Sequence, residues 1–291
     1  MFAAGDRSGL QLRGLADGAR HGRDDRSLRQ EVYARLRAWA RVGVVATVLI
    51  SIAVISLLAR YTTVCDIKRT RRITRLVQLF SRSMLRFLNV QCIIEADAAQ
   101  DFDNHAGMLI IPNHMSYLDI LVINALFPAV FVTSREIEKT PVLGHITKVA
   151  GCTFIERRHK RDLHRDIDRL SALLNEGINV TLFPEGTTTA GDHILPFKKS
   201  LFEAAIRSKA RVVPVCLRYE TVGGEAFSHA NHDSIAWYGK MKFLPHLLKL
   251  VSVKSIVVRL TVLPDMQFRG HRCRKKLADD TRAKIVAHYF V

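Results

Sequence analysis

Cysteine is scarce in this sequence, and the few cysteines present are spread too far apart to act together. The five of them are odd in number and form no C-x-x-C pair, so neither a disulfide framework nor a zinc site is indicated. None of the twelve histidines falls in an H-E-x-x-H motif, which argues against a metal centre of the metalloprotease type. The chain also lacks a G-x-S-x-G motif, so a serine acyl-enzyme is not indicated. We expect no metal ion.

Acidic residues are outnumbered, because 27 Asp and Glu stand against 44 Lys and Arg, which leaves a formal net charge of +17. This excess predicts a polyanionic partner, and both a nucleic acid and an anionic lipid surface would fit. Charge alone does not choose between them. With 291 residues, 48% of them hydrophobic, the chain can bury a core in one large domain or two small ones, which argues against a disordered protein.

Long apolar runs are absent except for one near the N-terminus. Residues 1–30 mix Gly, Arg, Asp and Ser without apolar periodicity and predict a mobile basic tail, with a solvated start to the next helix as the alternative. Residues 42–59 carry no charge and are bracketed by Arg41 and Arg60. This run is just long enough to span a bilayer, whereas a secretory signal would place its apolar stretch nearer the N-terminus. It predicts a retained membrane anchor, with a buried core helix as the alternative.

The segment that follows, residues 68–90, has apolar residues at helical spacing and six arginines among its other positions. It predicts a basic amphipathic helix suited to an anionic lipid interface, although a surface helix of the globular domain would show the same periodicity. Lys and Arg are equally numerous close to either side of the uncharged run, so the positive-inside rule gives no orientation. A re-entrant or monotopic arrangement explains this tie at least as well as a single span. We therefore predict membrane-anchoring helices in residues 31–91, with the active site on the cytoplasmic face of the membrane.

Beyond residue 92, short apolar runs alternate with amphipathic helices, a pattern typical of an α/β domain. We expect a mixed sheet flanked by helices. Two helices are predicted, at 141–150 and at 162–176, the second of which stops at Gly177. The predicted strands are residues 108–111, 130–133, 153–156, 179–183 and 212–217.

The first candidate site is the segment Asn113-His114-Met115-Ser116-Tyr117-Leu118-Asp119, which follows a predicted strand. In α/β proteins, sites form where a strand ends and opens into a helix. His114 titrates near neutral pH and can take a proton from a hydroxyl, while a nearby carboxylate such as Asp119 can fix its tautomer. The alternative is structural, because Ser116-x-x-Asp119 also fits a helix capping box.

Three further segments carry chemistry only in combination. Residues 183–189 (F-P-E-G-T-T-T) follow a strand and offer backbone N–H groups and hydroxyls suited to a polar or phosphate ligand. Residues 151–158 end in Arg157 and Arg158, where a cation could clamp a phosphate. The run 212–215 (V-V-P-V) is a strand interrupted by proline. Taken singly, each of these segments is ordinary.

Together, in this order and spacing, the four segments resemble the motif blocks of the lysophosphatidic acid acyltransferases, also called 1-acylglycerol-3-phosphate O-acyltransferases. The resemblance covers roughly residues 70–225, and its strongest parts are H-x4-D and F-P-E-G-T. It implies that residues 92–291 form an acyltransferase domain preceded by the family's two-helix membrane anchor. It also implies His114 as general base with Asp119 as its partner. The residues implied in binding the acceptor's glycerol phosphate are Arg157, Glu185, Gly186 and Thr187, assisted by Lys198.

This resemblance implies transfer of a fatty acyl group from acyl-CoA or acyl carrier protein to the hydroxyl of lysophosphatidic acid, forming phosphatidic acid. No cofactor is needed, and the expected partners are a lysophospholipid, the acyl donor and an anionic membrane surface, with no nucleic acid. Three positions differ from the usual family residues, namely Glu156, Thr188 and Ser200. Because residues 237–250 faintly resemble acyltransferases of lyso-ornithine lipids, that acceptor or another lysolipid is the alternative. A non-enzymatic basic membrane or nucleic-acid-binding protein would leave the paired motifs unexplained.

Overall fold

A computed structural model describes residues 66–96, 107–141, 143–156, 160–266 and 273–290, together with residues 32, 33, 36, 39–43, 46, 47 and 50. The predicted tail at residues 1–30 and most of the uncharged run 42–59 lie outside these ranges. Within the ranges described, no helix is both long enough and apolar enough to cross a membrane.

The described residues form a mixed eight-stranded sheet in the order β1-β8-β6-β2-β5-β3-β4, with β7 paired to β6. The run from β6 through β2, β5 and β3 to β4 is parallel, β1 is parallel to β8, and β8 is antiparallel to β6. All five predicted strands are present, and the predicted mixed α/β fold is confirmed. The strands are β1 (Val90–Ala96), β2 (Leu109–Pro112), β3 (Ala129–Ser134), β4 (Thr153–Ile155), β5 (Asn179–Leu182), β6 (Val212–Val222), β7 (Glu225–Ala226) and β8 (Ile256–Val262).

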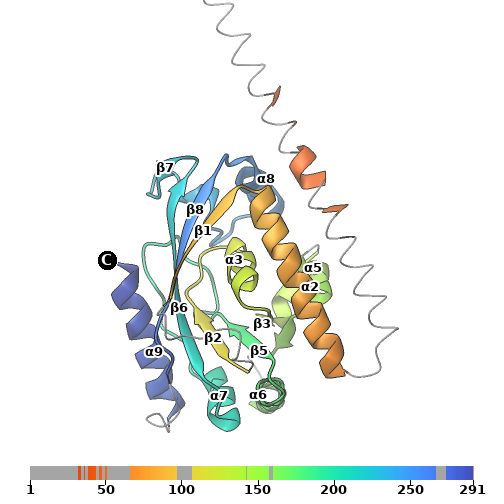
Figure 1. Cartoon of the computed structure of the whole chain (residues 1–291), viewed down its shortest axis with the longest axis vertical. Helices are drawn as coiled ribbons and strands as arrows, with labels where there is room; N and C mark the ends of the chain where they lie inside the picture. The colour runs from red at the N-terminus through yellow and green to blue at the C-terminus, as the bar shows by residue number, and fades with distance from the viewer. Residues whose placement is uncertain are drawn as a thin grey trace, which may run out of the picture.

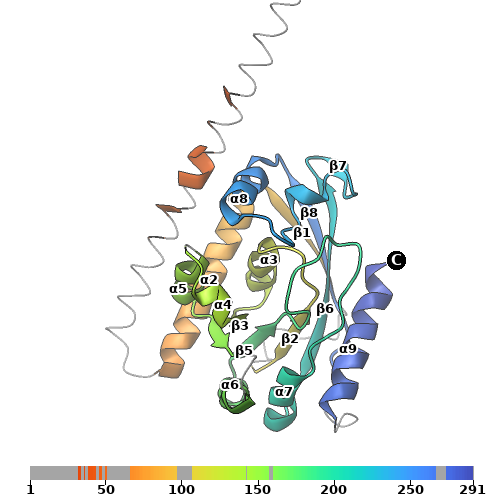
Figure 2. The ribbon, with the colours of Figure 1, turned by 180° about the vertical axis from the view of Figure 1, so that it is seen from behind.

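Helices cover both faces of this sheet. In Figures 1 and 2, α9 lies against one face, whereas α2 and α3 lie together on the other. The middle of the sheet is therefore shielded from water on both sides, and every residue of β2 is buried, as expected for a central parallel strand. The helices are α2 (Asp66–Phe87), α3 (Leu118–Leu126), α4 (Arg135–Glu138), α5 (Leu143–Val149), α6 (Lys160–Asn175), α7 (Glu203–Ser208), α8 (Phe243–Ser252) and α9 (Arg274–Tyr289).

The basic amphipathic helix predicted at residues 68–90 is α2, and it packs against the globular fold. Its buried side chains Met84 and Leu85 belong to the hydrophobic core, and Arg82 donates a hydrogen bond of 2.8 Å to the carbonyl of Ala125 in α3. The strand after it, β1, pairs with β8 and crosses the predicted domain boundary at residue 92. Leu79, by contrast, points outward and is 59% exposed. One face of α2 thus belongs to the core and the other remains available at the surface.

Candidate active site

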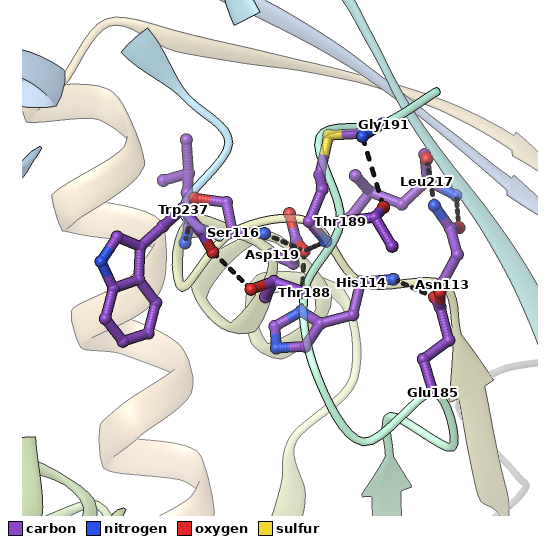
Figure 3. A network of polar contacts seen from close by, with 12 residues as sticks. Asn113, His114, Ser116, Asp119, Glu185, Thr188, Thr189, Gly191, Leu217 and Trp237 are labelled. Atoms are coloured by element: carbon purple, nitrogen blue, oxygen red, sulfur yellow. Dashed lines mark hydrogen bonds and ion pairs between the residues drawn. The ribbon is translucent and has the colours of Figure 1, made fainter. Parts of the chain in front are cut away.

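Two motif segments meet because the strands that carry them are neighbours. The segment with His114 follows β2, the segment 183–189 follows β5, and β2 pairs with β5 in parallel. The carboxyl ends of parallel strands lie at the same edge of a sheet, so both segments emerge side by side. Figure 3 shows His114, Asp119 and Glu185 in this cluster of polar contacts.

The side chains of His114 and Asp119 form a direct pair. Nδ1 of His114 lies 2.9 Å from Oδ2 of Asp119, whose side chain is fully buried. The same oxygen accepts hydrogen bonds of 2.8 Å from the backbone N–H groups of Met115 and Ser116. The bond to Ser116 is half of the capping-box pattern considered as an alternative, so Asp119 both supports the start of α3 and holds the imidazole.

The ring of His114 is fixed from a second side by an aromatic contact. It stacks on Phe183 with ring centroids 3.9 Å apart and planes inclined by 22°. With Nδ1 donating to a carboxylate, the neutral imidazole has its lone pair on Nε2. The His114 side chain is 16% exposed and lines a cavity of about 270 Å³ together with Gly186, Thr187 and Trp237. Nε2 is therefore the atom that can accept a proton from a bound hydroxyl.

Strand β6 is joined to the His114 segment by the side chains of Asn113 and Tyr219, to which the sequence assigned no role. Asn113 and Leu217 exchange two hydrogen bonds, of 2.9 Å from the amide nitrogen to the Leu217 carbonyl and 2.8 Å from the Leu217 N–H to the amide oxygen. The Tyr219 hydroxyl donates a hydrogen bond of 2.7 Å to Oδ1 of Asp119. The hydroxyl of a buried tyrosine usually has a hydrogen-bond partner, but nothing in the sequence indicates that the partner of Tyr219 is Asp119.

Glu185 contacts the backbone of the site. Its Oε1 accepts a hydrogen bond of 2.8 Å from the N–H of His114, and its Oε2 accepts one of 2.8 Å from the N–H of Leu195. Burial raises the pKa of Glu185, and these two backbone hydrogen bonds oppose the rise. The carboxylate therefore joins the loop after β5 to the loop after β2.

The remaining predicted binding residues are placed differently. Gly186 and Thr187 line the cavity beside His114, and Gly186 has a φ of +74°, which favours glycine. Lys198 lines a separate cavity of about 410 Å³ with Lys199, and Phe183 borders both cavities. Its backbone N–H donates to the carbonyl of Pro184 at 2.8 Å. Arg157 lies outside the described residues.

An apolar cavity of about 180 Å³ adjoins the site. It lies among α2, α3, α5 and α8, and it shares Ile120, Thr147 and Cys152 with the cavity that contains His114. Burial raises the pKa of the Cys152 thiol to about 12, so this cysteine stays protonated at neutral pH and is a poor nucleophile. Where the chain is described, no group of three or more His, Cys, Asp or Glu side chains is arranged to hold a metal ion.

Comparison with known proteins agrees with this geometry. The family model named Acyltransferase matches residues 93–218. The lyso-ornithine lipid O-acyltransferase of Brucella abortus is 30% identical over 192 residues, which cover 63% of this chain and 72% of that enzyme. This chain belongs to the acyltransferase family. The family includes the 1-acyl-sn-glycerol-3-phosphate acyltransferase of Neisseria meningitidis serogroup B, which is 36% identical over 155 residues, covering 53% of this chain. That match spans 58% of the length of the Neisseria enzyme.

The fold of the acyltransferase family extends over most of the chain. The crystal structure of the 1-acyl-sn-glycerophosphate acyltransferase of Thermotoga maritima superposes with a TM-score of 0.64 at 16% sequence identity. It covers 89% of this chain and 96% of the Thermotoga chain. Membership of this family argues against the alternative of a non-enzymatic basic protein.

Proposed function

We propose that this acyltransferase moves a fatty acyl group from an acyl thioester, acyl-CoA or acyl carrier protein, to the free hydroxyl of lysophosphatidic acid, forming phosphatidic acid. The observation that carries the proposal is the His114–Asp119 pair, 2.9 Å apart, on the wall of a cavity of mixed polar and apolar lining that adjoins an almost entirely apolar one. The polar groups of the first cavity, such as those of His114 and Thr187, suit the reacting hydroxyl and headgroup, and the apolar cavity suits an acyl chain.

In the proposed reaction His114 acts as general base. Nε2 takes the proton from the acceptor hydroxyl while the hydroxyl oxygen attacks the thioester carbonyl carbon. The tetrahedral intermediate then collapses, the C–S bond breaks, and the imidazolium returns its proton to the departing thiolate. Asp119 stabilises the imidazolium between these two transfers, through the hydrogen bond to Nδ1.

The acyl chain would occupy the cavity among α2, α3, α5 and α8. Its wall is almost entirely apolar and includes Val77, Phe80, Leu121, Ile146 and Leu247. Each CH₂ moved from water into such a place contributes about 0.8 kcal/mol. Because Ile120, Thr147 and Cys152 border both cavities, a chain bound there would bring its carbonyl end toward His114.

The acceptor headgroup would lie near His114, beside Gly186 and Thr187, with Arg157 as the proposed phosphate-binding cation. Lys198 lines a different cavity and is not assigned to the phosphate. A lyso-ornithine lipid is the second candidate acceptor, because the match to the Brucella enzyme that acts on it extends over more of this chain than the match to the Neisseria enzyme does. An ornithine headgroup has no phosphate, so the two acceptors place different demands on Arg157.

Thiol release from acyl-CoA and from acyl carrier protein, measured with each acceptor in turn, tests the proposal. A charge-assisted hydrogen bond to phosphate contributes roughly 1.5 to 3 kcal/mol, so Arg157→Ala should lower kcat/KM for lysophosphatidic acid about 10- to 100-fold. Arg157→Lys should retain part of the activity. Equal small losses on both acceptors, or a wild type that ignores lysophosphatidic acid, would favour lyso-ornithine lipid. Absence of acceptor-dependent thiol release with every lysolipid would refute the acyltransferase proposal.

We also propose that the enzyme works on a membrane, with its active site on the cytoplasmic face and its N-terminal segment as anchor. The net charge of +17 and the exposed Leu79 on the basic helix α2 support contact with an anionic lipid surface. A protein that begins at Asp66 retains α2 and its core contacts but lacks the anchor, and it should move toward the soluble fraction. Release of the full-length protein by high salt alone would contradict the anchor, because apolar insertion is not screened as charge is.

A further inference from the structure

Tyr219 of β6 makes a contact that the proposed reaction leaves unexplained. The side chain is buried, and its hydroxyl donates a hydrogen bond of 2.7 Å to Oδ1 of Asp119. Oδ2, the other carboxylate oxygen, faces His114 and two backbone N–H groups. The match to the acyltransferase family model covers residues 93–218 and therefore does not include Tyr219.

We propose that Tyr219 is a positioning residue of the reaction proposed above, on which this inference rests. By binding Oδ1 it holds the carboxylate of Asp119 so that Oδ2 faces Nδ1 of His114, and it thereby sets how strongly His114 retains a proton. Tyr219 acts through Asp119 and needs no contact with either substrate.

The strand that carries Tyr219 is fixed relative to the His114 segment at a second point. Leu217, two residues earlier on β6, exchanges two hydrogen bonds with Asn113, the residue before His114. The pairing of β6 with β8 shifts register directly after Tyr219, between Tyr219 and Thr221, and such irregularities re-aim side chains in strands near sites. The segment from Asn113 to Asp119 is thus held at both ends by the same strand, β6.

The Tyr219 hydroxyl stays protonated throughout the working range. Burial, first of all, and then the negative charge of Asp119 raise the pKa of Tyr219 well above its ordinary value. It therefore donates to Oδ1 at every pH at which the enzyme would act. Without this donor, Oδ1 of Asp119 would be buried and would lack the hydrogen bond from Tyr219, which destabilises the negative charge of the carboxylate. Asp119 would then hold a proton, or draw one onto His114, at higher pH.

Other titratable groups surround the pair, and substitution of Tyr219 by Phe leaves them in place. Glu185 faces His114 and Asp119 from the loop after β5, and Tyr289 faces Asp119 from α9. Cys92 of β1 and Tyr117, directly before α3, are the other titratable groups whose charge would raise the pKa of Tyr219. A change in titration after Tyr219→Phe would therefore report the lost hydroxyl.

The test compares Tyr219→Phe with Tyr289→Phe in the full-length protein. Tyr289 is also buried, but its hydroxyl donates to the backbone carbonyl of Gly191 at 2.8 Å, so its variant controls for loss of a buried hydroxyl. The titration of His114 is followed by NMR on histidine-labelled protein, with the signal assigned by its absence in His114→Gln. The same proteins are assayed for kcat/KM across the pH range.

For Tyr219→Phe we expect the His114 titration midpoint and the acidic limb of kcat/KM to move to higher pH by roughly one unit, with partial recovery of rate at high pH. Tyr289→Phe should move neither. A His114 midpoint equal to that of wild type, with a loss of rate uniform in pH, would overturn the inference. The NMR titration needs no substrate, so it decides the role of Tyr219 even if the proposed acyl transfer is not observed.

Discussion

The carboxylate of Glu185 holds the backbone N–H of His114 at 2.8 Å and, through its other oxygen, the N–H of Leu195 at 2.8 Å. Both carboxylate oxygens therefore have partners within the protein. An acceptor hydroxyl that bound to Glu185 would have to share these oxygens with the backbone. This geometry indicates a supporting role for Glu185, in which its two hydrogen bonds fix the position of the His114 segment relative to the loop that follows β5.

Replacement of Glu185 by Gln tests this role. The amide can accept at one end only, so its NH₂ would face one of the two backbone N–H groups. We expect a loss of roughly 1 to 3 kcal/mol in the free energy of unfolding, measured by thermal or chemical denaturation, and a fall in kcat. Glu225→Gln, on the exposed strand β7, is the matched control. An unchanged melting temperature with a raised KM for the acceptor alone would instead assign Glu185 to acceptor binding.

Removal of the proposed base, His114, should abolish most turnover without unfolding the protein. His114→Ala is expected to lower kcat by about 10²- to 10⁴-fold, the usual range for losing a positioned base, and Asp119→Asn should act in the same direction. Circular dichroism checks the fold. His193→Ala, whose exposed side chain pairs with Asp192, should retain activity. If folded His114→Ala protein turned over like wild type, the mechanism would be wrong.

The apolar cavity should limit the length of the acyl chain. Ala150 lies on its wall, and Ala150→Phe fills part of the space. We expect kcat/KM for a palmitoyl donor to fall at least about tenfold relative to a decanoyl donor, because several CH₂ groups lose their apolar surroundings. Ala172→Phe places the same bulk on the exposed side of α6 and should leave the ratio unchanged. Equal losses for both donors would show that the chain binds elsewhere.

Stability should depend on pH through His246. Its Nε2 must carry hydrogen to donate to the carbonyl of Ala236 at 2.9 Å, so Nδ1 accepts from the Tyr117 hydroxyl at 2.9 Å and the ring is neutral. Burial lowers the pKa of His246 below its ordinary value of 6.5. As pH falls, His246 therefore binds a proton in the unfolded chain before it does so in the folded chain. The contribution of neutral His246 to the free energy of unfolding is present above its ordinary pKa and is lost as pH falls toward its lower pKa in the folded protein.

The melting temperature of wild type should therefore fall between about pH 7.5 and about pH 5.5, and His246→Gln should show a smaller fall. His193→Gln, changed at an exposed position, should behave like wild type. A pH dependence of equal size in His246→Gln and wild type would mean that other groups account for it.

Some features of the fold escaped sequence reasoning for a specific reason. The central parallel strands were found because they are nearly continuous apolar runs. Strands β1 and β8 were missed. Along β8 buried and half-buried residues alternate, and β1 is mostly accessible after its first residue, so neither forms the continuous apolar run that indicates a central strand. Likewise, the spacing of apolar residues in α2 predicted an amphipathic helix. It could not show whether the apolar face packs against another helix, such as α3, or against a lipid surface.

By itself the sequence determined what depends on near neighbours: the strand–loop–helix unit that brings His114 against Asp119, the glycine that permits a φ of +74° at residue 186, and the type of most central elements. Only the tertiary structure decided that Glu185 binds the backbone of His114, that Tyr219 binds Asp119, and that Lys198 opens to a different cavity. The physical reason is that spacing within one element fixes its side chains through local backbone geometry. Partners about a hundred residues apart, such as Asp119 and Tyr219, are fixed by the order of strands in the sheet, which hydrophobic burial of the whole domain selects.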